Sequence, residues 1–176
     1  METKIIQNAV SPLLLDYMRL QAENSDKWNF KYPLGKTPFH LKHAKLEIKG
    51  NKIFDDFLFG IAQSILICLY EKEQKVFYPD PILFCGLSMK DSYREDNTHT
   101  DHVNDGMKNE KIVKALGILN MDWKTEWGGG FVHDDITYNL RPTDFILFDP
   151  RVSHRAANIT TDRKRIAIDF TMKSQY

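Results

Sequence analysis

Three side chains of this sequence are of the types that hold a metal ion: His99, Asp101 and His154. In an extended segment the side chains at positions i and i+2 point to the same side, so His99 and Asp101 can reach one ion together. His154 follows a run at 145–149 that reads as a strand and a turn at Pro150, which can place it at the mouth of a barrel. Two imidazoles and one carboxylate can cover one face of an octahedral metal and leave the other face open.

These ligand types suit ferrous iron and also zinc, so ligand identity alone does not choose the metal. An isolated His-x-Asp also occurs in surface loops that bind nothing. We expect His102 and His133 to be solvent-facing or hydrogen-bonded histidines, and we give His40 and His43 no metal role. The glycines at 128–130 lack the Lys-Ser/Thr ending of a phosphate-binding loop and indicate a turn into a strand.

The later part of the chain contains short apolar or alternating runs bounded by turn-forming residues. These runs lie at 82–89, 112–120, 129–133, 144–148 and 165–172. The last run alternates, with Ile166, Ile168, Phe170 and Met172 on one face. Many short strands separated by turns are typical of a β sandwich or barrel.

The earlier part of the chain predicts helices. Ser11 and Pro12 form a plausible helix start, with the hydroxyl as cap, before a short helix at 13–22. The strongest helix is at 53–73, and its apolar residues cover most of its circumference, which predicts burial on more than one side. We expect a single domain across 1–176, with a helical part at about 1–79 and a β core at about 80–173.

Composition excludes several classes of protein. The 176 residues suit one domain, and 24 basic against 24 acidic side chains give no net charge, which argues against a nucleic-acid partner. The most apolar segment, 57–70, is shorter than the roughly 20 residues of a membrane span, and the N-terminus shows no secretion signal. Cys68 and Cys85 lie in apolar runs that suit a reducing compartment, so we expect a soluble cytoplasmic protein without a membrane partner. The sequence leaves the oligomeric state open.

Together these fragments resemble the 2-oxoglutarate- and Fe(II)-dependent dioxygenase superfamily, particularly its prolyl-4-hydroxylase-like branch. The resemblance covers about 82–172. Its order is His-Thr-Asp at 99–101, Gly-Ile-Leu-Asn-Met-Asp-Trp at 117–123 leading to Trp-Gly-Gly at 127–129, Arg-Pro at 141–142, Phe-Ile-Leu-Phe at 145–148, His154, and Arg-Ile-Ala-Ile at 165–168.

The resemblance implies a mixed but mainly β fold, a double-stranded β-helix (jelly roll) with N-terminal helices packed on the larger sheet. It implies Fe(II), 2-oxoglutarate and O2 as cofactor and co-substrates, with His99, Asp101 and His154 as the iron ligands.

A basic residue at the start of the strand after the distal histidine would bind the far carboxylate of 2-oxoglutarate. Strand parity puts Arg163 and Arg165 on one face and Lys164 on the other. We favour Arg165, which directly precedes the apolar run, over Arg163. Relatives commonly add a tyrosine hydroxyl to this carboxylate site. Ile118 stands at that position here, and Tyr93 is the candidate substitute.

The implied reaction couples oxidative decarboxylation of 2-oxoglutarate to hydroxylation of an unactivated C–H bond. Halogenating relatives have a small residue where this chain has Asp101, so hydroxylation is favoured, while desaturation and epoxidation stay open. A nucleic-acid demethylase fits less well, because the second arginine expected six residues after the first is replaced by Thr171 or Asp169.

The substrate class is less defined than the reaction. The short chain leaves little surface for docking modules, so we expect a small molecule such as an amino acid or a natural-product intermediate. The alternatives are a peptidyl or protein side-chain hydroxylase and a non-oxidative, cupin-like metal- or ligand-binding protein. The aromatic stretch with Trp28, Phe30, Tyr32 and Phe39 is expected to pack the N-terminal part onto the barrel, with a substrate lid as the weaker hypothesis.

Overall fold

The computed structural model describes residues 2–31, 43–49, 55–73, 76–93, 96–101 and 111–175. Tyr32, Phe39, His40 and His102 lie outside these residues, as do the side chains of Phe30 and His43. The predictions made for these six side chains therefore stay predictions.

The described chain consists of short strands and two α-helices. The helices are α1 (Pro12–Glu23) and α2 (Asp56–Lys72). The strands are β1 (Lys4–Ile6), β2 (Asn29–Lys31), β3 (His43–Lys49), β4 (Phe77–Lys90), β5 (Ile112–Ile118), β6 (Phe131–His133), β7 (Ile136–Tyr138), β8 (Phe145–Phe148), β9 (His154–Ala156) and β10 (Arg165–Ser174). A 3₁₀ turn lies at Thr125–Trp127.

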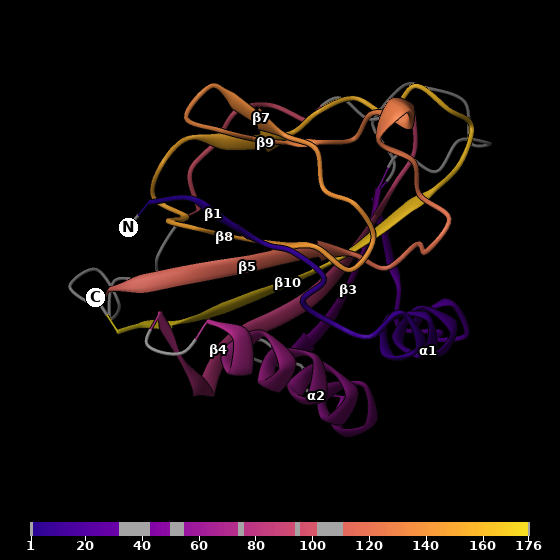
Figure 1. Cartoon of the computed structure of the whole chain (residues 1–176). Coiled ribbons are helices and arrows are strands. Elements are labelled where there is room, and N and C mark those ends of the chain that lie inside the picture. Colours follow the sequence, from indigo (N-terminus) through magenta and orange to yellow (C-terminus); the bar gives the residue numbers. More distant parts are fainter. Residues whose placement is uncertain are drawn as a thin grey trace.

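The strands form two antiparallel sheets that face each other. The large sheet has the order β1-β8-β5-β10-β4-β3-β2, and the small sheet has the order β7-β6-β9. Figure 1 shows the small sheet above one face of the large sheet and both helices below the other face. The predicted jelly roll with helices on its larger sheet is confirmed.

The side chains of β10 alternate between its two faces, as predicted for 165–172. One face packs toward the helices and the other is turned toward the small sheet. Ile166, Ile168, Phe170 and Met172 are buried in the core between the large sheet and the helices. A second apolar cluster, which includes Ile118, Phe131, Ile146 and Phe148, fills the space between the two sheets. Burying each such side chain contributes about 1.5–3 kcal/mol.

Gly117 shows how closely the helix-side core is packed. The ring of Phe145 lies across this glycine, and a Cβ at position 117 would lie 2.5 Å from the ring. Because no side chain fits there without moving Phe145, the small residue on β5 is a packing requirement.

The first helix begins where predicted, with Ser11 at the N-cap and Pro12 in the first turn, whereas the second begins later than predicted. Ser11 precedes α1, but its side chain makes no capping hydrogen bond. The α2 helix begins at Asp56 rather than at 53, because Asp55 is its N-cap and accepts a hydrogen bond from the Leu58 N–H at 3.1 Å.

The α2 helix also buries less of its circumference than we predicted. Its buried residues form one stripe at Leu58, Ile61, Ala62, Ile65, Leu66 and Leu69. Phe57 and Ile67 are more than half exposed, so the expected burial on more than one side is wrong. The large sheet and α1 cover only part of the circumference of α2, and apolar side chains on its remaining face stay in solvent.

The part expected to be helical contains strands as well. β1 pairs with β8 at one edge of the large sheet, while β2 and β3 extend its other edge next to β4. The large sheet therefore recruits strands from both ends of the chain. Within the described residues, neither helix is long and apolar enough to cross a membrane.

Candidate metal centre

The segment 99–101 lies against β9 and the turn before it. The His99 N–H donates to the His154 carbonyl at 3.0 Å, and the His154 N–H donates back to the His99 carbonyl at 2.8 Å. The Asp101 N–H donates to the Pro150 carbonyl at 2.9 Å. This pairing continues the small sheet by one more short extended segment, and it brings residues that are 55 positions apart in the sequence side by side.

A buried ion pair holds the approach to this segment. Lys90, at the end of β4, lies 2.9 Å from the Asp96 carboxylate, and both side chains are almost fully buried. The Lys90 ammonium also donates to the Ala157 carbonyl at 3.1 Å. These contacts join β4, the residues before His99 and the residue after β9, so they tie together the segments on either side of the site.

The three predicted ligands converge. The candidate ligand atoms of His99, Asp101 and His154 all lie within 4.8 Å of one another. His99 Nε2 is 3.9 Å from Asp101 Oδ1, and His154 Nε2 is 3.7 Å from Asp101 Oδ2. The imidazole centroids are 4.6 Å apart. Spacings of this order allow one ion to sit between the three side chains.

The hydrogen bonds of both imidazoles favour the tautomer that leaves Nε2 free to bind a metal. His99 Nδ1 lies 2.9 Å from the Asn97 carbonyl, and His154 Nδ1 lies 2.8 Å from the Val152 carbonyl. A carbonyl only accepts, so each Nδ1 carries the proton and each Nε2 keeps its lone pair. Burial lowers the pKa of His154, which favours its neutral form.

Asp101 presents the charge that a cation needs. Burial alone would raise the pKa of Asp101, but the Lys114 ammonium and the two histidines hold it below its usual range. Asp101 Oδ2 is buried, and among the described residues it has an ion-pair partner but no partner in hydrogen-bonding geometry. Two imidazoles with free Nε2 atoms and an ionised, half-buried carboxylate fit a divalent metal ion.

The two candidate arginines have different surroundings. Arg165 begins β10 and is 4% exposed, with its side chain between the sheets. A Cβ at position 129 would lie 3.0 Å from Nη1 of Arg165, so Gly129, whose φ is +70°, leaves the space that the guanidinium occupies. Gly128 and Gly129 thus form the predicted turn into a strand, here β6.

Arg163 lies on the outside. It forms an ion pair with Asp122, its guanidinium stacks 4.6 Å from the Trp127 ring centroid, and more than half of its side chain is exposed. The parity argument that put both arginines on one face fails because β10 begins only at Arg165. The alternation of a strand does not extend into the bend that precedes it.

The other predicted residues lie as follows. Tyr93 follows β4, is 52% exposed, and its N–H donates to the Asp91 carboxylate at 3.0 Å. Its role at the co-substrate stays a prediction. His133 is buried, with Nδ1 2.9 Å from the Thr3 hydroxyl and Nε2 3.1 Å from the Asp149 carbonyl. It is therefore a hydrogen-bonded histidine, one of the two environments expected for it.

Lys114 and Asp169 are neighbours of the metal centre that the sequence reasoning did not assign. Lys114 Nζ lies 2.8 Å from Asp101 Oδ2 and 3.0 Å from Asp169 Oδ2. The sequence held a signal for both residues. Lys114 is the only charged residue in the apolar run 112–120, and Asp169 is the only charged residue in 166–172. Burial would lower the pKa of Lys114, yet Asp169 and Asp101 raise it far above its ordinary value. The two carboxylates therefore favour the charged form of Lys114 beside Asp101, the predicted carboxylate ligand.

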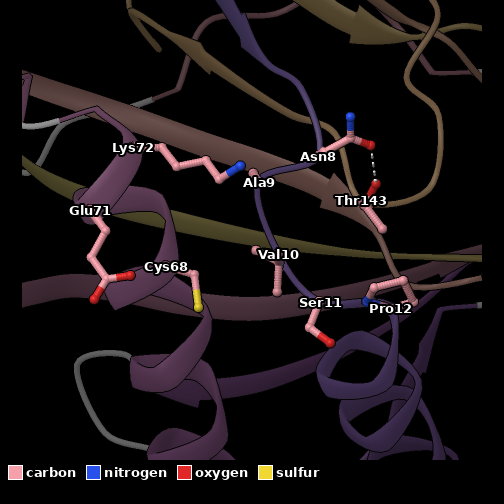
Figure 2. A pocket seen from close by; sticks show the side chains of 9 residues that line it. All are labelled: Asn8, Ala9, Val10, Ser11, Pro12, Cys68, Glu71, Lys72 and Thr143. Carbon is pink, nitrogen blue, oxygen red and sulfur yellow. Dashed lines mark hydrogen bonds between the residues drawn. The ribbon is translucent and has the colours of Figure 1, made fainter.

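A separate hollow lies on the helix side of the large sheet. The cavity has a volume of about 380 Å³, and the Thr143 hydroxyl donates to Asn8 Oδ1 at 3.4 Å in its lining. Figure 2 shows the side chains that line it. Its lining comes from the chain before α1, the start of α1, the end of α2 and Thr143. Its charged residues, Glu71 and Lys72, are exposed, and none of the predicted site residues lines it.

Comparison with known proteins finds similarity in structure only. No family model matches this sequence, and no curated protein matches it. Among solved structures, a Pseudomonas putida prolyl-4-hydroxylase is 13% identical, with a TM-score of 0.61 over 97% of this chain and 91% of that chain. HygX from Streptomyces hygroscopicus, solved with nickel and 2-oxoglutarate bound, is 11% identical, with a TM-score of 0.66 over 97% and 82% of the two chains.

A third similar structure is the α-ketoglutarate-dependent carbocyclase SnoK from nogalamycin biosynthesis. It is 13% identical, with a TM-score of 0.69 over 97% of this chain and 79% of that chain. At such identities the likeness shows the fold. The resemblance read from the sequence is thus confirmed as a shared fold over nearly the whole chain.

Proposed function

We propose that this chain, which has the fold of prolyl hydroxylases and other 2-oxoglutarate oxygenases, is itself an Fe(II)- and 2-oxoglutarate-dependent dioxygenase. The observation that carries the proposal is the convergence of His99, Asp101 and His154 within 4.8 Å. Their donor types suit a ferrous ion with open positions. The enzyme would hydroxylate an unactivated C–H bond while 2-oxoglutarate is decarboxylated to succinate.

Each protein group has a distinct task in this proposal. His99 and His154 offer the Nε2 lone pairs and Asp101 offers a carboxylate oxygen. When bound, iron with 2-oxoglutarate and O2 supplies the oxidising power for C–H hydroxylation. The backbone carbonyls of Asn97 and Val152 keep both Nδ1 atoms protonated, which holds the imidazoles in the binding orientation.

Arg165 is the proposed partner of the far carboxylate of 2-oxoglutarate. Its guanidinium lies between the sheets, and a planar guanidinium can meet a carboxylate with two hydrogen bonds. Arg163 is a poorer candidate because Asp122 and Trp127 occupy it at the surface. Apolar side chains around His154, among them Phe131 and Phe148 with ring centroids 5.7 and 5.2 Å away, would exclude water from the reacting centre.

We propose a small molecule as the substrate, such as an amino acid or a natural-product intermediate. The described chain offers one jelly roll and two helices, and no further docking domain among the described residues. A peptide substrate is the alternative, since one structural neighbour is a prolyl hydroxylase from Trichoplax adhaerens in complex with a peptide fragment.

The test is anaerobic addition of Fe(II) and 2-oxoglutarate, followed by air. We expect a weak visible charge-transfer band that requires both components, and succinate once O2 is admitted. A screen of amino acids and related metabolites should raise succinate formation for the true substrate class, and a set of proline-containing peptides tests the alternative. If neither band nor succinate forms while the metal still binds, the chain is a cupin-like binding protein instead.

A further inference from the structure

Lys114 connects three separate elements at the metal centre. It lies on β5, and its ammonium contacts Asp101, which follows the His99 segment, and Asp169, which lies on β10. The side chains of Lys114 and Asp169 are only 15% and 20% exposed. A shielded cation between two carboxylates interacts more strongly than the same pair would in water.

The strand register explains why these groups meet. In the β5–β10 ladder Lys114 is opposite Thr171 and Asp169 is opposite Leu116, so Lys114 and Asp169 are diagonal neighbours on one face. That face is the side of the large sheet that looks toward the small sheet, because Ile168 and Phe170 of β10 are buried on the helix side. Lys114 and Asp169 therefore lie on the face of the large sheet that is turned toward the small sheet, and Lys114 contacts Asp101 there.

This geometry raises a problem of ligand number. Asp169 is a second carboxylate that shares one ammonium group with the carboxylate ligand. Carboxylates are good ligands for ferrous iron and manganese, and a fourth protein ligand would take a position that the keto acid or O2 requires. Asp169 is not one of the three side chains whose ligand atoms converge, and its carboxylate instead contacts Lys114.

We propose that Lys114 is a positioning residue that keeps Asp169 out of the metal's coordination shell, so that the centre keeps one carboxylate and an open face. This inference rests on the proposed function. Lys114 achieves it by neutralising Asp169 and by engaging Asp101 Oδ2, which leaves Oδ1 of the same carboxylate on the side of His99.

Charge then predicts the sign of each substitution. Lys114→Met removes a cation beside the metal and releases Asp169, so Mn²⁺ should bind about tenfold more tightly. The released carboxylate competes with the keto acid, so 2-oxoglutarate should bind the Mn²⁺-loaded variant more weakly. Asp169→Asn leaves the ammonium to Asp101 alone, and Mn²⁺ should bind more weakly. The double variant Lys114→Met/Asp169→Asn restores the local net charge and should return Mn²⁺ affinity close to that of the wild type.

The experiment is calorimetric titration of Mn²⁺ into the metal-free full chain, followed by 2-oxoglutarate into the loaded chain. Co²⁺ absorption spectra of the same variants report any change in the ligand set. The matched control is Lys27→Met, which removes a lysine from another 2.7 Å ion pair, with Asp55, at the start of α2. Its Mn²⁺ affinity should equal that of the wild type.

Four variants keep the test decisive. Unchanged or weaker Mn²⁺ binding by folded Lys114→Met would overturn the inference, and so would a double variant that behaves like Lys114→Met. If Lys114→Met does not fold, Asp169→Asn decides alone, and unchanged Mn²⁺ affinity in that variant is contrary to the inference. If the His99→Ala variant binds Mn²⁺ as tightly as the wild type does, the proposed function itself is refuted. That outcome is separate from a failure of the inference about Lys114.

Discussion

The two faces of β10 carry different kinds of side chain. On the helix side Ile166, Ile168, Phe170 and Met172 are buried in an apolar core. On the side toward the small sheet, Arg165 is a buried charged residue, and Asp169 pairs with Lys114, which also contacts Asp101. One face of β10 is therefore apolar core and the other carries buried charge, and under the proposed function substitutions on the two faces should fail in different ways.

The largest effect is expected at the metal ligands. Asp101→Ala should abolish succinate formation and weaken Mn²⁺ binding by more than about 100-fold, since changes even to groups behind a ligand cost 10–100-fold. The melting temperature should change little, because Asp101 is partly exposed and lies outside the apolar cores. Calorimetry and thermal unfolding measure the two properties separately. An active Asp101→Ala variant would show that the ligand assignment is wrong.

On the helix face, the loss should be in stability. Phe170 is fully buried, so Phe170→Ala should lower the free energy of unfolding by about 3–5 kcal/mol through the cavity that it leaves. Chemical denaturation measures this change. The variant that remains folded should bind Mn²⁺ as the wild type does. A large loss of metal affinity in the folded fraction would mean that the two faces are not separable.

Substitution of Arg165, the first residue of β10, should weaken the binding of 2-oxoglutarate. Arg165→Met should raise the Kd for 2-oxoglutarate by about 10–100-fold, because charge-assisted hydrogen bonds contribute roughly 1.5–3 kcal/mol. Mn²⁺ affinity should be unchanged. Arg163→Met is the matched control, since Arg163 lies at the surface with Asp122, and it should change the Kd for 2-oxoglutarate by less than about threefold. The reverse result would assign the co-substrate to Arg163.

The smallest effect is expected where α2 begins, in the layer that only supports the sheet. Burial would raise the pKa of Asp55, but the Lys27 ammonium and the Leu58 N–H outweigh it and hold the pKa below its usual value. Because that pKa is lower in the folded protein, its contribution is complete above the unfolded value, near 4, and is lost as the pH falls through the folded value.

Asp55→Ala should therefore lower the free energy of unfolding by about 1 kcal/mol at pH 7. The difference from the wild type should shrink as the pH falls below about 4. Denaturation curves at several pH values measure it, with succinate formation at pH 7 unchanged. A difference that stays constant down to low pH would mean that the capping carboxylate does not carry the effect.

Local patterns predicted the features that depend on neighbouring residues in the chain. The alternation at 165–172 predicted both faces of β10, and the i, i+2 spacing predicted that His99 and Asp101 point to one side. The exposed stripe of α2 was missed because an apolar residue in a helix does not reveal how many layers cover it. The three-residue strands β7 and β9 are too short to show a period of their own.

Features that depend on pairing between distant segments were outside the reach of the sequence. The meeting of His99 with His154 was inferred through a family resemblance, and the structure places it in backbone hydrogen bonds between the two residues. The difference between Arg163 and Arg165 depends on the residue at which β10 begins. Lys114 could be recognised as a neighbour of Asp101 only once the β5–β10 register was known.

By itself the sequence determined the ligand types, the mainly β architecture and the apolar face of the last strand, because composition and periodicity act over a few neighbouring residues. Tertiary structure alone decided that Lys114 lies between two carboxylates, that Arg165 is buried while Arg163 is not, and that β1 closes an edge of the large sheet. These outcomes depend on strand register and on which surfaces bury each other, and both are properties of the whole folded chain.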